Sequence, residues 1–552
     1  MTFSHRIASL RDSQGSTFSF PKSGVICVVG GNNAGKSQLL RDIYASIDEN
    51  SARPVTFSDL QVTQTKGTID DAAAWLEEHG ERLRNEPGYG PSYVPRHSRF
   101  GTNGMEANQN FVMWFKGTPY LGNAARFFVD HIPAGSLSQF ASGSIASDSS
   151  YGALNTPLTA IYADGELEQQ LSDLSQQTFG LPLTLDRVGV SIRLAIGEVD
   201  VPIPPINRPT HEYAAAVQAL PLFDHQGDGV KSFIGLALKV MTRSTEILLV
   251  DEPEAFLHPG QARALGRWIG QAASELDLQI FVATHDRDFV LGLLEADNTP
   301  ALSVLRITRE DGGSAMAQLP PDEVRAVWED PVLRYSNVLQ GLFHRKVFVC
   351  ESDGDCRFYG AAFDQLAIES DQRAVSDDTL FVPSGSKNRI GALLRALSSL
   401  RVEAAAIVDF DIFKSKADLK GIVTATGGIW SAEMDVCYNT LLQPINAAKA
   451  QGNDRWPELK QSGMAAVAPG SPYRAAQDLL GLLANTHVHV VPVGEMEGFD
   501  RASNLHGAAW VSSALENGSH TSKAVTDFVI PMLASTPHLS DEVEISRNDG
   551  GA

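Results

Sequence analysis

Acidic residues come directly after apolar stretches in the second half of the chain. Glu351 follows "KVFVC", Asp355 comes four positions later, and Asp409 and Asp411 follow "AAAIV". Carboxylates held close together raise one another's pKa values and destabilise a fold unless a positive charge lies among them. Oxygen ligands in this number favour Mg²⁺ or Mn²⁺ over zinc. The pattern therefore predicts a divalent-cation site, and the alternative is a set of solvated helix caps on unrelated loops.

The segments around these acids alternate between strand and helix patterns. Strands are predicted over "KVFVCE", "TLFVPSG" and "AAAIVDFD", with helices over residues 355–367 and "SKNRIGALLRALSSL". This order predicts a parallel sheet, whose ligands bind at the carboxyl ends of the strands. Because side chains alternate along a strand, Asp409 and Asp411 are expected to point to the same side. Asp355, in the first turn of a helix, is expected to face the same spot.

The first half of the chain contains a nucleotide-binding pattern. The β-branched run "GVICVV" precedes the spacing G-x-x-x-x-G-K-[ST], and a helical pattern follows it. In this arrangement backbone N–H groups surround the phosphates, the lysine reaches the terminal phosphates, and the serine can bind Mg²⁺. The residues of this loop predicted to bind ATP are Gly30, Asn32, Asn33, Gly35, Lys36 and Ser37.

Two further apolar strands end in residues suited to ATP hydrolysis. Asp251 and Glu252 follow "EILLV", and His285 follows "QIFVAT". Asp251 is predicted to hold Mg²⁺ together with Ser37, and Glu252 to orient or deprotonate the attacking water. His285 is predicted to sense the γ-phosphate, although a lone histidine at such a place is more often a capping or core residue.

More than 200 residues separate Lys36 from Asp251, so a large insertion, about 50–210, is expected between them. This arrangement, with the D-E pair, "LHP" and a following T-H, resembles ABC-type ATPases of the SMC and RecF class. The resemblance implies that two heads enclose ATP, and hence a homodimer or higher homo-oligomer. It also implies a signature loop, for which "HQGDGVKSFIGLAL" is the candidate. There Gly227, Gly229 and Ser232 are expected in a glycine-rich turn before a helix.

The set E-x-x-x-D, "SGSK" and D-x-D, each after a predicted strand, resembles the Toprim domain shared by topoisomerases, primases and OLD-family nucleases. An ABC-type ATPase joined to a C-terminal Toprim domain resembles the OLD family or ATPase-Toprim relatives in bacterial anti-phage defence. The resemblance implies that Glu351, Asp355, Asp409 and Asp411 bind Mg²⁺ or Mn²⁺. It also implies that Lys387 contacts the cleaved or a neighbouring phosphate.

A late strand, "HVHVV", precedes two more acids. Glu497 in "GEMEG" resembles the G-x-x-E element of such nucleases, with Glu495 in reserve. Metal binding by Glu497 would complete a two-metal site. The alternative is that Glu497 is an acid without a role in metal binding. Ser352, where a glycine commonly follows the glutamate, departs from the family pattern and leaves the local turn open. Basic residues that either neutralise nearby phosphates or simply face solvent are Arg389, Arg395, Arg401, Lys414, Lys416 and Lys420.

Composition limits the classes of protein. A chain of 552 residues with 43% hydrophobic content should hold more than one domain. The predicted fold is α/β: an ABC-type P-loop ATPase head over 1–335, with an inserted helical or dimerisation segment, and a Toprim-like parallel α/β domain over 336–552. Four cysteines without metal-ligand spacing argue against structural zinc, and a net charge of −22 argues against coating nucleic acid through the overall field. A soluble, cytoplasmic protein without a membrane partner is expected.

The favoured function is an ATP-gated, Mg²⁺- or Mn²⁺-dependent nuclease that cleaves DNA in anti-phage defence, with a partner defence protein among its expected partners. RNA such as tRNA is the nearest rival substrate. A non-nucleolytic ABC-type ATPase that acts as a sensor or scaffold is the alternative of a different class. Candidates for a nucleotide-sensing glutamine, which the sequence does not rank, are Gln61, Gln64 and Gln139.

Overall fold

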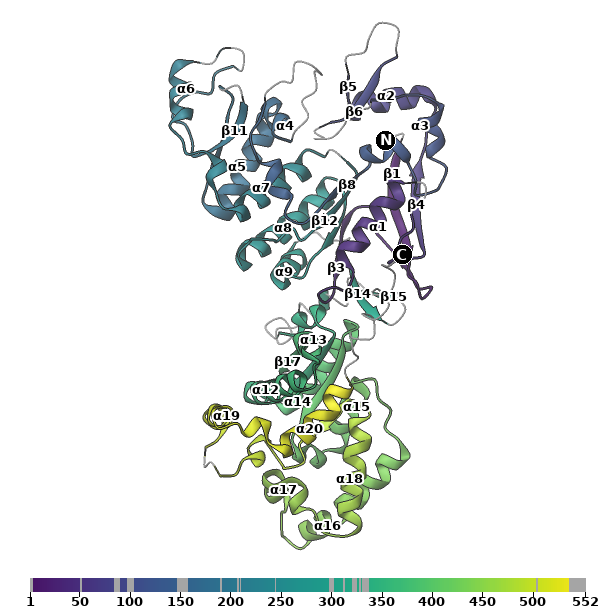
Figure 1. Cartoon of the computed structure of the whole chain (residues 1–552), viewed down its shortest axis with the longest axis vertical. Coiled ribbons are helices and arrows are strands. Elements are labelled where there is room, and N and C mark those ends of the chain that lie inside the picture. The colour runs from purple at the N-terminus through teal and green to yellow at the C-terminus, as the bar shows by residue number, and fades with distance from the viewer. Residues whose placement is uncertain are drawn as a thin grey trace, which may run out of the picture. The chain divides into compact units, whose positions relative to one another are not determined.

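The computed structural model describes residues 3–49, 52–83, 90–96, 104–145, 157–188, 191–205, 208, 210–243, 245–296, 302–310, 313–319, 325–326, 329, 337–502 and 505–535. The chain forms two compact units, Met1–Pro321 and Asp322–Ala552, each with a hydrophobic core of its own (Figure 1). The boundary between the units falls before the predicted one at residue 335. No helix in the described ranges combines the length and the apolar character needed to cross a membrane.

A six-stranded sheet forms the centre of the first unit, in the order β15-β14-β3-β13-β12-β8. Neighbouring strands are parallel except for the β14–β15 hairpin. The strands are β3 Gly24–Val29, β8 Val129–Ile132, β12 Ile247–Asp251, β13 Gln279–Ala283, β14 Leu302–Glu310 and β15 Gly313–Leu319. Every residue of β3, β12 and β13 is buried, as expected for parallel strands covered on both faces.

Four helices pack around the strands that carry the predicted ATPase residues: α1 Lys36–Asp48, α7 Asp228–Met241, α8 Pro259–Glu275 and α9 Arg287–Glu295. Helices α8 and α9 approach closely because glycines lie at their contact. A Cβ atom on Gly266 would lie 2.2 Å from the carbonyl oxygen of Phe289, and one on Gly292 would lie 2.1 Å from that of Arg263.

Two strands of the expected insertion over about 50–210 pair with strands outside it and so belong to the sheets of the first unit. Strand β4 (Asp59–Thr65) pairs antiparallel with β1 (Ser4–Arg11) in a sheet of order β2-β1-β4, with β2 at Thr17–Ser19. Strand β8 is the edge of the central sheet. The other elements between 66 and 225 are α2 Ile69–His79, β5 Gly80–Arg82, β6 Ser92–Pro95, β7 Met105–Glu106, α3 Gln109–Trp114, η1 Gly122–Phe127, η2 Leu137–Phe140, β9 Ser144–Ile145, α4 Pro157–Ala163, α5 Gly165–Phe179, β10 Leu183–Asp186, β11 Ser191–Ile196, α6 His211–Gln218 and η3 Phe223–His225.

The second unit contains a parallel sheet in the order β17-β16-β18-β19, which confirms the predicted alternation of strands and helices. The strands are β16 Lys346–Cys350, β17 Thr379–Pro383, β18 Glu403–Val408 and β19 Val488–Val490. The helices are η4 Asn337–Phe343, α12 Asp353–Glu369, α13 Arg373–Asp377, α14 Lys387–Ser399, η5 Phe410–Lys414, α15 Lys416–Ala425, α16 Ala432–Ala450, α17 Trp456–Ser462, η6 Gly463–Ala466, α18 Ser471–Ala484, η7 Met496–Phe499, α19 Gly507–Glu516, η8 Ser519–Thr521 and α20 Lys523–Ala534.

Candidate functional sites

The phosphate loop lies between β3 and α1. Asn33 and Gly35 adopt positive φ values of 59° and 101°, which turn the backbone sharply into the helix. Asn32 and Asn33 are exposed. The Lys36 amine donates hydrogen bonds to the carbonyl oxygens of Gly30 (3.0 Å) and of its neighbour (2.8 Å). The loop therefore forms a concave turn at a helix N-terminus, which suits an anion, with Lys36 folded across it.

The structure brings the two predicted magnesium ligands of the ATPase together. The Ser37 hydroxyl donates a hydrogen bond to Oδ1 of Asp251 (3.0 Å), although the residues are 214 positions apart. Burial raises the pKa of the Asp251 carboxyl, and the bond from Ser37 opposes that rise. A hydroxyl and a carboxylate fit Mg²⁺, which takes one or two such protein ligands beside phosphate and water oxygens.

The predicted water-activating and phosphate-sensing residues are in contact. Nδ1 of His285 lies 3.0 Å from Oε1 of Glu252, which has a left-handed φ of 47°. A third residue, Glu254, was not predicted. Its Oε1 accepts hydrogen bonds from the Thr284 hydroxyl (2.6 Å) and the His285 backbone N–H (3.3 Å). Burial raises the pKa of Glu254 to about 7. In the sequence, Glu254 is the second glutamate of "DEPE". It lies in neither a strand pattern nor a helix pattern, so no periodicity distinguishes it.

The candidate signature loop differs from the expected turn. Gly227 is the N-cap of α7, and Gly229 and Ser232 lie inside the helix, because it begins at Asp228. Ser232 is buried. A Cβ atom on Gly229 would lie 2.4 Å from the carbonyl oxygen of Phe256, so the start of α7 touches the loop after β12. The nucleotide-binding role of the three residues stays a prediction.

The structure favours one of the three glutamine candidates. Gln61 and Gln64 lie on β4, where Oε1 of Gln64 accepts a hydrogen bond from the Gly117 N–H (2.7 Å). Gln139 lies in η2, shortly after β8. Strand β8 runs parallel to β12, with Ile132 beside Val250, so it ends at the same edge of the sheet as Asp251. Gln139 is therefore the candidate on the ATP-binding edge.

Glu351 and Asp355 lie at the carboxyl end of β16, as predicted. Ser352 is the N-cap of α12, and its hydroxyl accepts a hydrogen bond from the Asp355 N–H, while the Asp355 carboxylate accepts bonds from Ser352. This capping box shows that the local turn, which the sequence left open at Ser352, is the N-terminus of a helix. The helix start is thereby fixed beside Glu351.

Asp409 and Asp411 follow β18, but the reason given for their alignment is wrong. The strand ends at Val408, Asp409 is the N-cap of η5, and Asp411 lies within that 3₁₀ helix. Their directions therefore come from a helical turn and not from strand alternation. The Phe410 N–H, between them, donates a hydrogen bond to the Gly494 carbonyl (2.8 Å), which ties this turn to the loop after β19.

The four predicted acids act on one another electrostatically. Burial raises the pKa of Asp409 to about 8, and the charges of Glu351, Asp355 and Asp411 add to the rise. The pKa of Glu351 is also raised, by burial first and then by Asp411 and Asp355, against the charge of Lys387. The four carboxyl groups therefore lie close enough for their charges to act on one another.

The late acids belong to the same cluster. Glu495 adds to the pKa rise of Asp409, and Glu497 adds to that of Asp355, which burial raises first. Oε1 of Glu497 accepts a hydrogen bond from the Gly507 N–H (2.9 Å). Glu495 thus lies near Asp409, and Glu497 lies near Asp355. These contacts do not decide whether Glu497 or Glu495 is the better candidate ligand.

Two lysines lie among these acids. Lys387, at the start of α14, forms an ion pair with Asp411. Lys460, which was not predicted, lies 3.6 Å from Glu495 (Nζ to Oε2). Of the flanking basic residues, Lys416 and Lys420 pair instead with Asp435 on α16 (2.9 and 3.4 Å).

The acidic cluster fits a hard divalent cation in its chemistry, because its donors are all carboxylates. Over the described ranges, however, no group of three or more Asp, Glu, His or Cys side chains is arranged to hold a metal ion. Lys387 forms an ion pair with one of these carboxylates, Asp411. The metal-binding role of Glu351, Asp355, Asp409, Asp411 and Glu497 stays a prediction.

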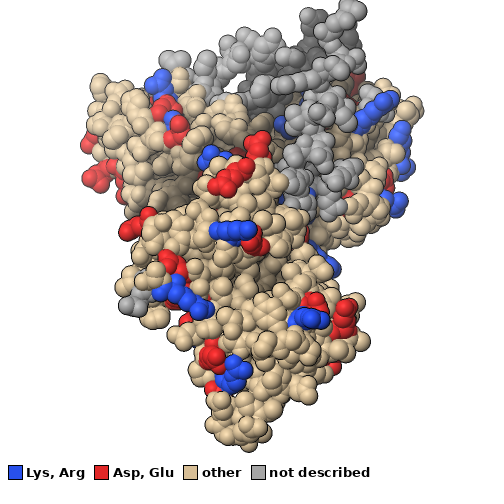
Figure 2. Space-filling view, turned by 60° about the horizontal axis from the view of Figure 1, so that its bottom comes forward, with Lys and Arg blue, Asp and Glu red and all other residues tan. Residues whose placement is uncertain are grey.

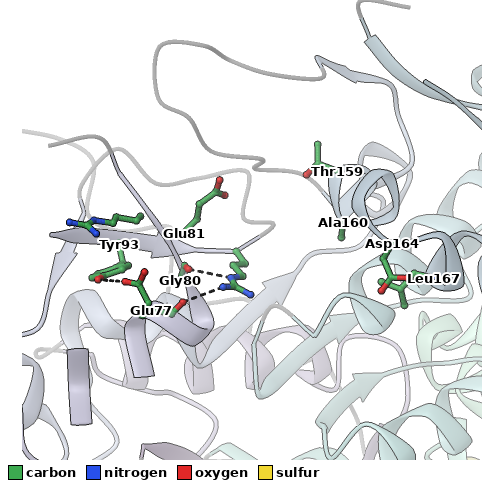
Figure 3. A pocket seen from close by; sticks show the side chains of 10 residues that line it. Glu77, Gly80, Glu81, Tyr93, Thr159, Ala160, Asp164 and Leu167 are labelled. Carbon is green, nitrogen blue, oxygen red and sulfur yellow. Dashed lines mark hydrogen bonds between the residues drawn. The ribbon is translucent and has the colours of Figure 1, made fainter. Parts of the chain in front are cut away.

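A separate pocket of about 480 Å³ lies in the first unit, between the α2–β6 segment and helices α4 and α5 (Figure 3). Its lining includes Glu77, Tyr93 and Asp164, and none of the predicted site residues.

On the face shown in Figure 2, Lys and Arg side chains lie scattered among Asp and Glu and form no continuous basic area.

Known proteins resemble parts of the chain. Residues 202–292 match the family model described as "AAA domain, putative AbiEii toxin, Type IV TA system". An OLD nuclease of Thermus scotoductus is 23% identical over 261 residues, which cover 45% of this chain and 46% of that protein. An uncharacterized protein of Methanocaldococcus jannaschii is 30% identical over 69 residues, which cover 12% of this chain and 60% of that protein. The chain thus matches about half the length of the OLD nuclease.

Similar solved structures include the SMC head domain of Thermotoga maritima, at 13% identity and a TM-score of 0.29, over 58% of this chain and all of that one (100%). Another is cbiO1, part of an ABC transporter complex of Clostridium perfringens, at 14% identity and a TM-score of 0.29, over 61% of this chain and 94% of that one. The AAA match includes Asp251, Glu252 and His285 and supports an ATPase, and a part of the chain is similar to the OLD nuclease.

Proposed function

We propose that the protein is an ATP-gated nuclease that uses Mg²⁺ or Mn²⁺ to hydrolyse phosphodiester bonds of DNA in bacterial anti-phage defence. The observation that carries this proposal is the group of half-buried acids after β16 and β18, in which burial first, and then Glu351, Asp355 and Asp411, raise the pKa of Asp409. A fold tolerates such a concentration of like charge where a cation is to be bound. The likeness to a protein named OLD nuclease supports the same reaction class.

In the second unit, Glu351, Asp355, Asp409, Asp411 and Glu497 would hold the cations. Mg²⁺ or Mn²⁺ bound there supplies an activated water and stabilises the leaving oxygen of a phosphodiester. Lys387 lies beside Asp411 and would pair with a phosphate oxygen once that carboxylate is engaged. These carboxyl groups are half-buried at the ends of strands and helices, and they would position the reacting phosphate.

In the first unit, the phosphate loop and Lys36 would hold ATP, and Ser37 and Asp251 would hold its Mg²⁺. Glu252 would orient the attacking water, and His285, in contact with Glu252, would respond to the γ-phosphate. Pairing of two such heads around ATP, with a homodimer or larger assembly as the result, would gate cleavage. Binding of nucleic acid should in turn change the affinity for ATP.

Purified protein incubated with plasmid, single-stranded DNA and tRNA, with Mg²⁺ or Mn²⁺ and with or without ATP, tests the proposal. Asp409→Ala should abolish cutting and keep ATP hydrolysis, whereas Lys36→Ala should abolish hydrolysis and change the ATP dependence of cutting. Asp478→Ala, at an exposed site on α18, is the matched control and should behave like wild type. Cutting by Asp409→Ala at the wild-type rate would show that the assigned site is wrong. Preferential cutting of tRNA would replace DNA by RNA as the substrate.

One observation favours a second function, an ATPase sensor or scaffold without nuclease activity. The ion pair of Lys387 with Asp411 compensates one of the negative charges of the cluster from within the chain. In that case wild type should hydrolyse ATP and cut none of the three substrates with either metal ion.

A further inference from the structure

We infer that Lys460 is a substrate-contacting residue of the acidic site, and that it binds a backbone phosphate of the nucleic acid beside the cleaved bond. The inference rests on the proposed nuclease function and assigns a residue that no motif of the chain marks. It concerns a lysine supplied by α17, outside the strand-end positions that carry the acids.

The backbone fixes α17 against the loop that follows β19. Gly463 and Gly494 have positive φ values of 53° and 109°. A Cβ atom on Gly463 would lie 2.2 Å from the carbonyl oxygen of Pro492, and one on Gly494 would lie 2.3 Å from that of Lys460. The Met464 N–H donates a hydrogen bond to the Pro492 carbonyl (2.8 Å). Lys460 is thereby held at a defined place beside Glu495.

The Lys460 ammonium lies in the field of the whole cluster. Burial lowers its pKa, but the charges of Glu495, Asp411 and Asp409 outweigh that effect and raise it. Nζ is 3.6 Å from Oε2 of Glu495, which is longer than a charge-assisted hydrogen bond of about 2.7–2.9 Å. The pair is therefore an attraction through space, which leaves the ammonium hydrogens available to a ligand.

The two lysines of the site differ in exposure and in contact. The side chain of Lys387 is 22% exposed and pairs directly with Asp411, whereas that of Lys460 is 51% exposed. Lys460 therefore offers an exposed positive charge beside a strongly acidic site. A phosphodiester bears one negative charge and acceptor oxygens, so it is the part of a nucleic acid that such a lysine can recognise.

Binding and cutting measurements on the full chain test the inference. A short fluorescein-labelled single strand of DNA, and the RNA of the same sequence, are titrated in Ca²⁺ and followed by fluorescence anisotropy at several salt concentrations. Lys460→Gln should weaken binding of the preferred strand about tenfold. It should also reduce the slope of log affinity against log salt by about 0.7. Lys460→Arg should keep both values near wild type, and so should Lys449→Gln, at an exposed site in the last turn of α16.

Cutting in Mn²⁺ distinguishes a failure of the Lys460 role from a failure of the proposed nuclease function. With Lys460→Gln, KM should rise by a factor similar to the loss of affinity, while ATP hydrolysis and the melting temperature stay at their wild-type values. Wild-type affinity, salt slope and KM for Lys460→Gln, together with an inactive Asp409→Ala, would overturn the role of Lys460 alone. No binding of either strand by wild type would overturn the role of Lys460 alone, whereas full cutting by Asp409→Ala would overturn the nuclease proposal and this inference with it.

Discussion

Asp251 and Asp409 lie at corresponding places, each at the carboxyl end of a parallel strand, yet their neighbours differ. Asp251 accepts a hydrogen bond from Ser37, whereas Asp409 faces Glu351, Asp355, Asp411 and Glu495. The sequence pattern of an apolar run followed by acids is enough to predict both Asp251 and Asp409 as site residues. It did not find Glu254 or Lys460, because both act through contacts with residues distant in the sequence and no local pattern marks them.

The contacts of Glu254 predict an effect on ATP hydrolysis. Glu254→Leu removes the acceptor that holds Thr284 and the His285 N–H, so His285 should lose its position beside Glu252. We expect kcat for ATP hydrolysis to fall about 10- to 100-fold with little change in KM. Glu254→Gln keeps an oxygen acceptor and should retain most of the activity. Wild-type kcat for a folded Glu254→Leu variant would show that Glu254 does not position His285.

Among the elements, long apolar runs could be predicted and short strands could not. "GVICVV", "EILLV" and "KVFVC" became β3, β12 and β16, because β-branched and aliphatic runs suit strands buried on both faces. Strand β4, "DLQVTQT", is mostly polar, and its partner β1 is distant in the sequence, so the sequence predicts an insertion there. The sequence predicts a strand through Asp409 and Asp411, because no residue in "AAAIVDFD" marks the end of the strand. The structure has a 3₁₀ helix there instead.

The close contact of α8 and α9 predicts that adding one methyl group at Gly292 lowers stability. Gly292→Ala places a Cβ atom against the backbone carbonyl of Arg263, at a distance of 2.1 Å before relaxation. Backbone cannot move aside as a side chain can, so the free energy of unfolding should fall by about 1–3 kcal/mol. Gly260→Ala, near the exposed start of α8 where nothing lies within 4 Å, is the control and should be neutral or slightly stabilising. Chemical denaturation of the first unit measures both, and equal stabilities would contradict the close contact.

The same helix pair predicts a pH dependence. Hydrogen bonds from Arg263 above all, and from Arg267, lower the pKa of Glu295 from its ordinary 4.5 to about 2. Because the folded-state value is depressed, the stabilisation is complete above pH 4.5 and is lost as the pH falls through 2. Urea unfolding should show Glu295→Gln less stable than wild type at neutral pH, with the difference shrinking below pH 4.5. Glu275→Gln, at the exposed end of α8, should show no such trend. A difference that is constant down to low pH would argue against the ion pair.

At the scale of the whole molecule, the division into two units followed from length and from the two separate strand-helix series. The two cores share no residue: one contains Ile26, Leu249 and Phe281, and the other contains Phe348, Ile407 and Trp510. The predicted nucleotide site lies in the first unit, and the predicted divalent-cation site lies in the second. A net charge of −22 agrees with both predictions, since bound cations reduce repulsion within the folded state.

Two cores with different ligands predict two separable unfolding transitions. In calorimetry, ATP with Mg²⁺ should raise the melting temperature of the first unit, because a ligand that binds only the folded state stabilises it. Mn²⁺ alone should raise that of the second. Lys36→Ala should cancel the first shift and leave the second, and Asp409→Asn should do the reverse. At a ligand concentration of about 100 Kd, each shift corresponds to about 2.7 kcal/mol. A single transition that both ligands move, and that both variants weaken equally, would contradict independent sites on independently folded units.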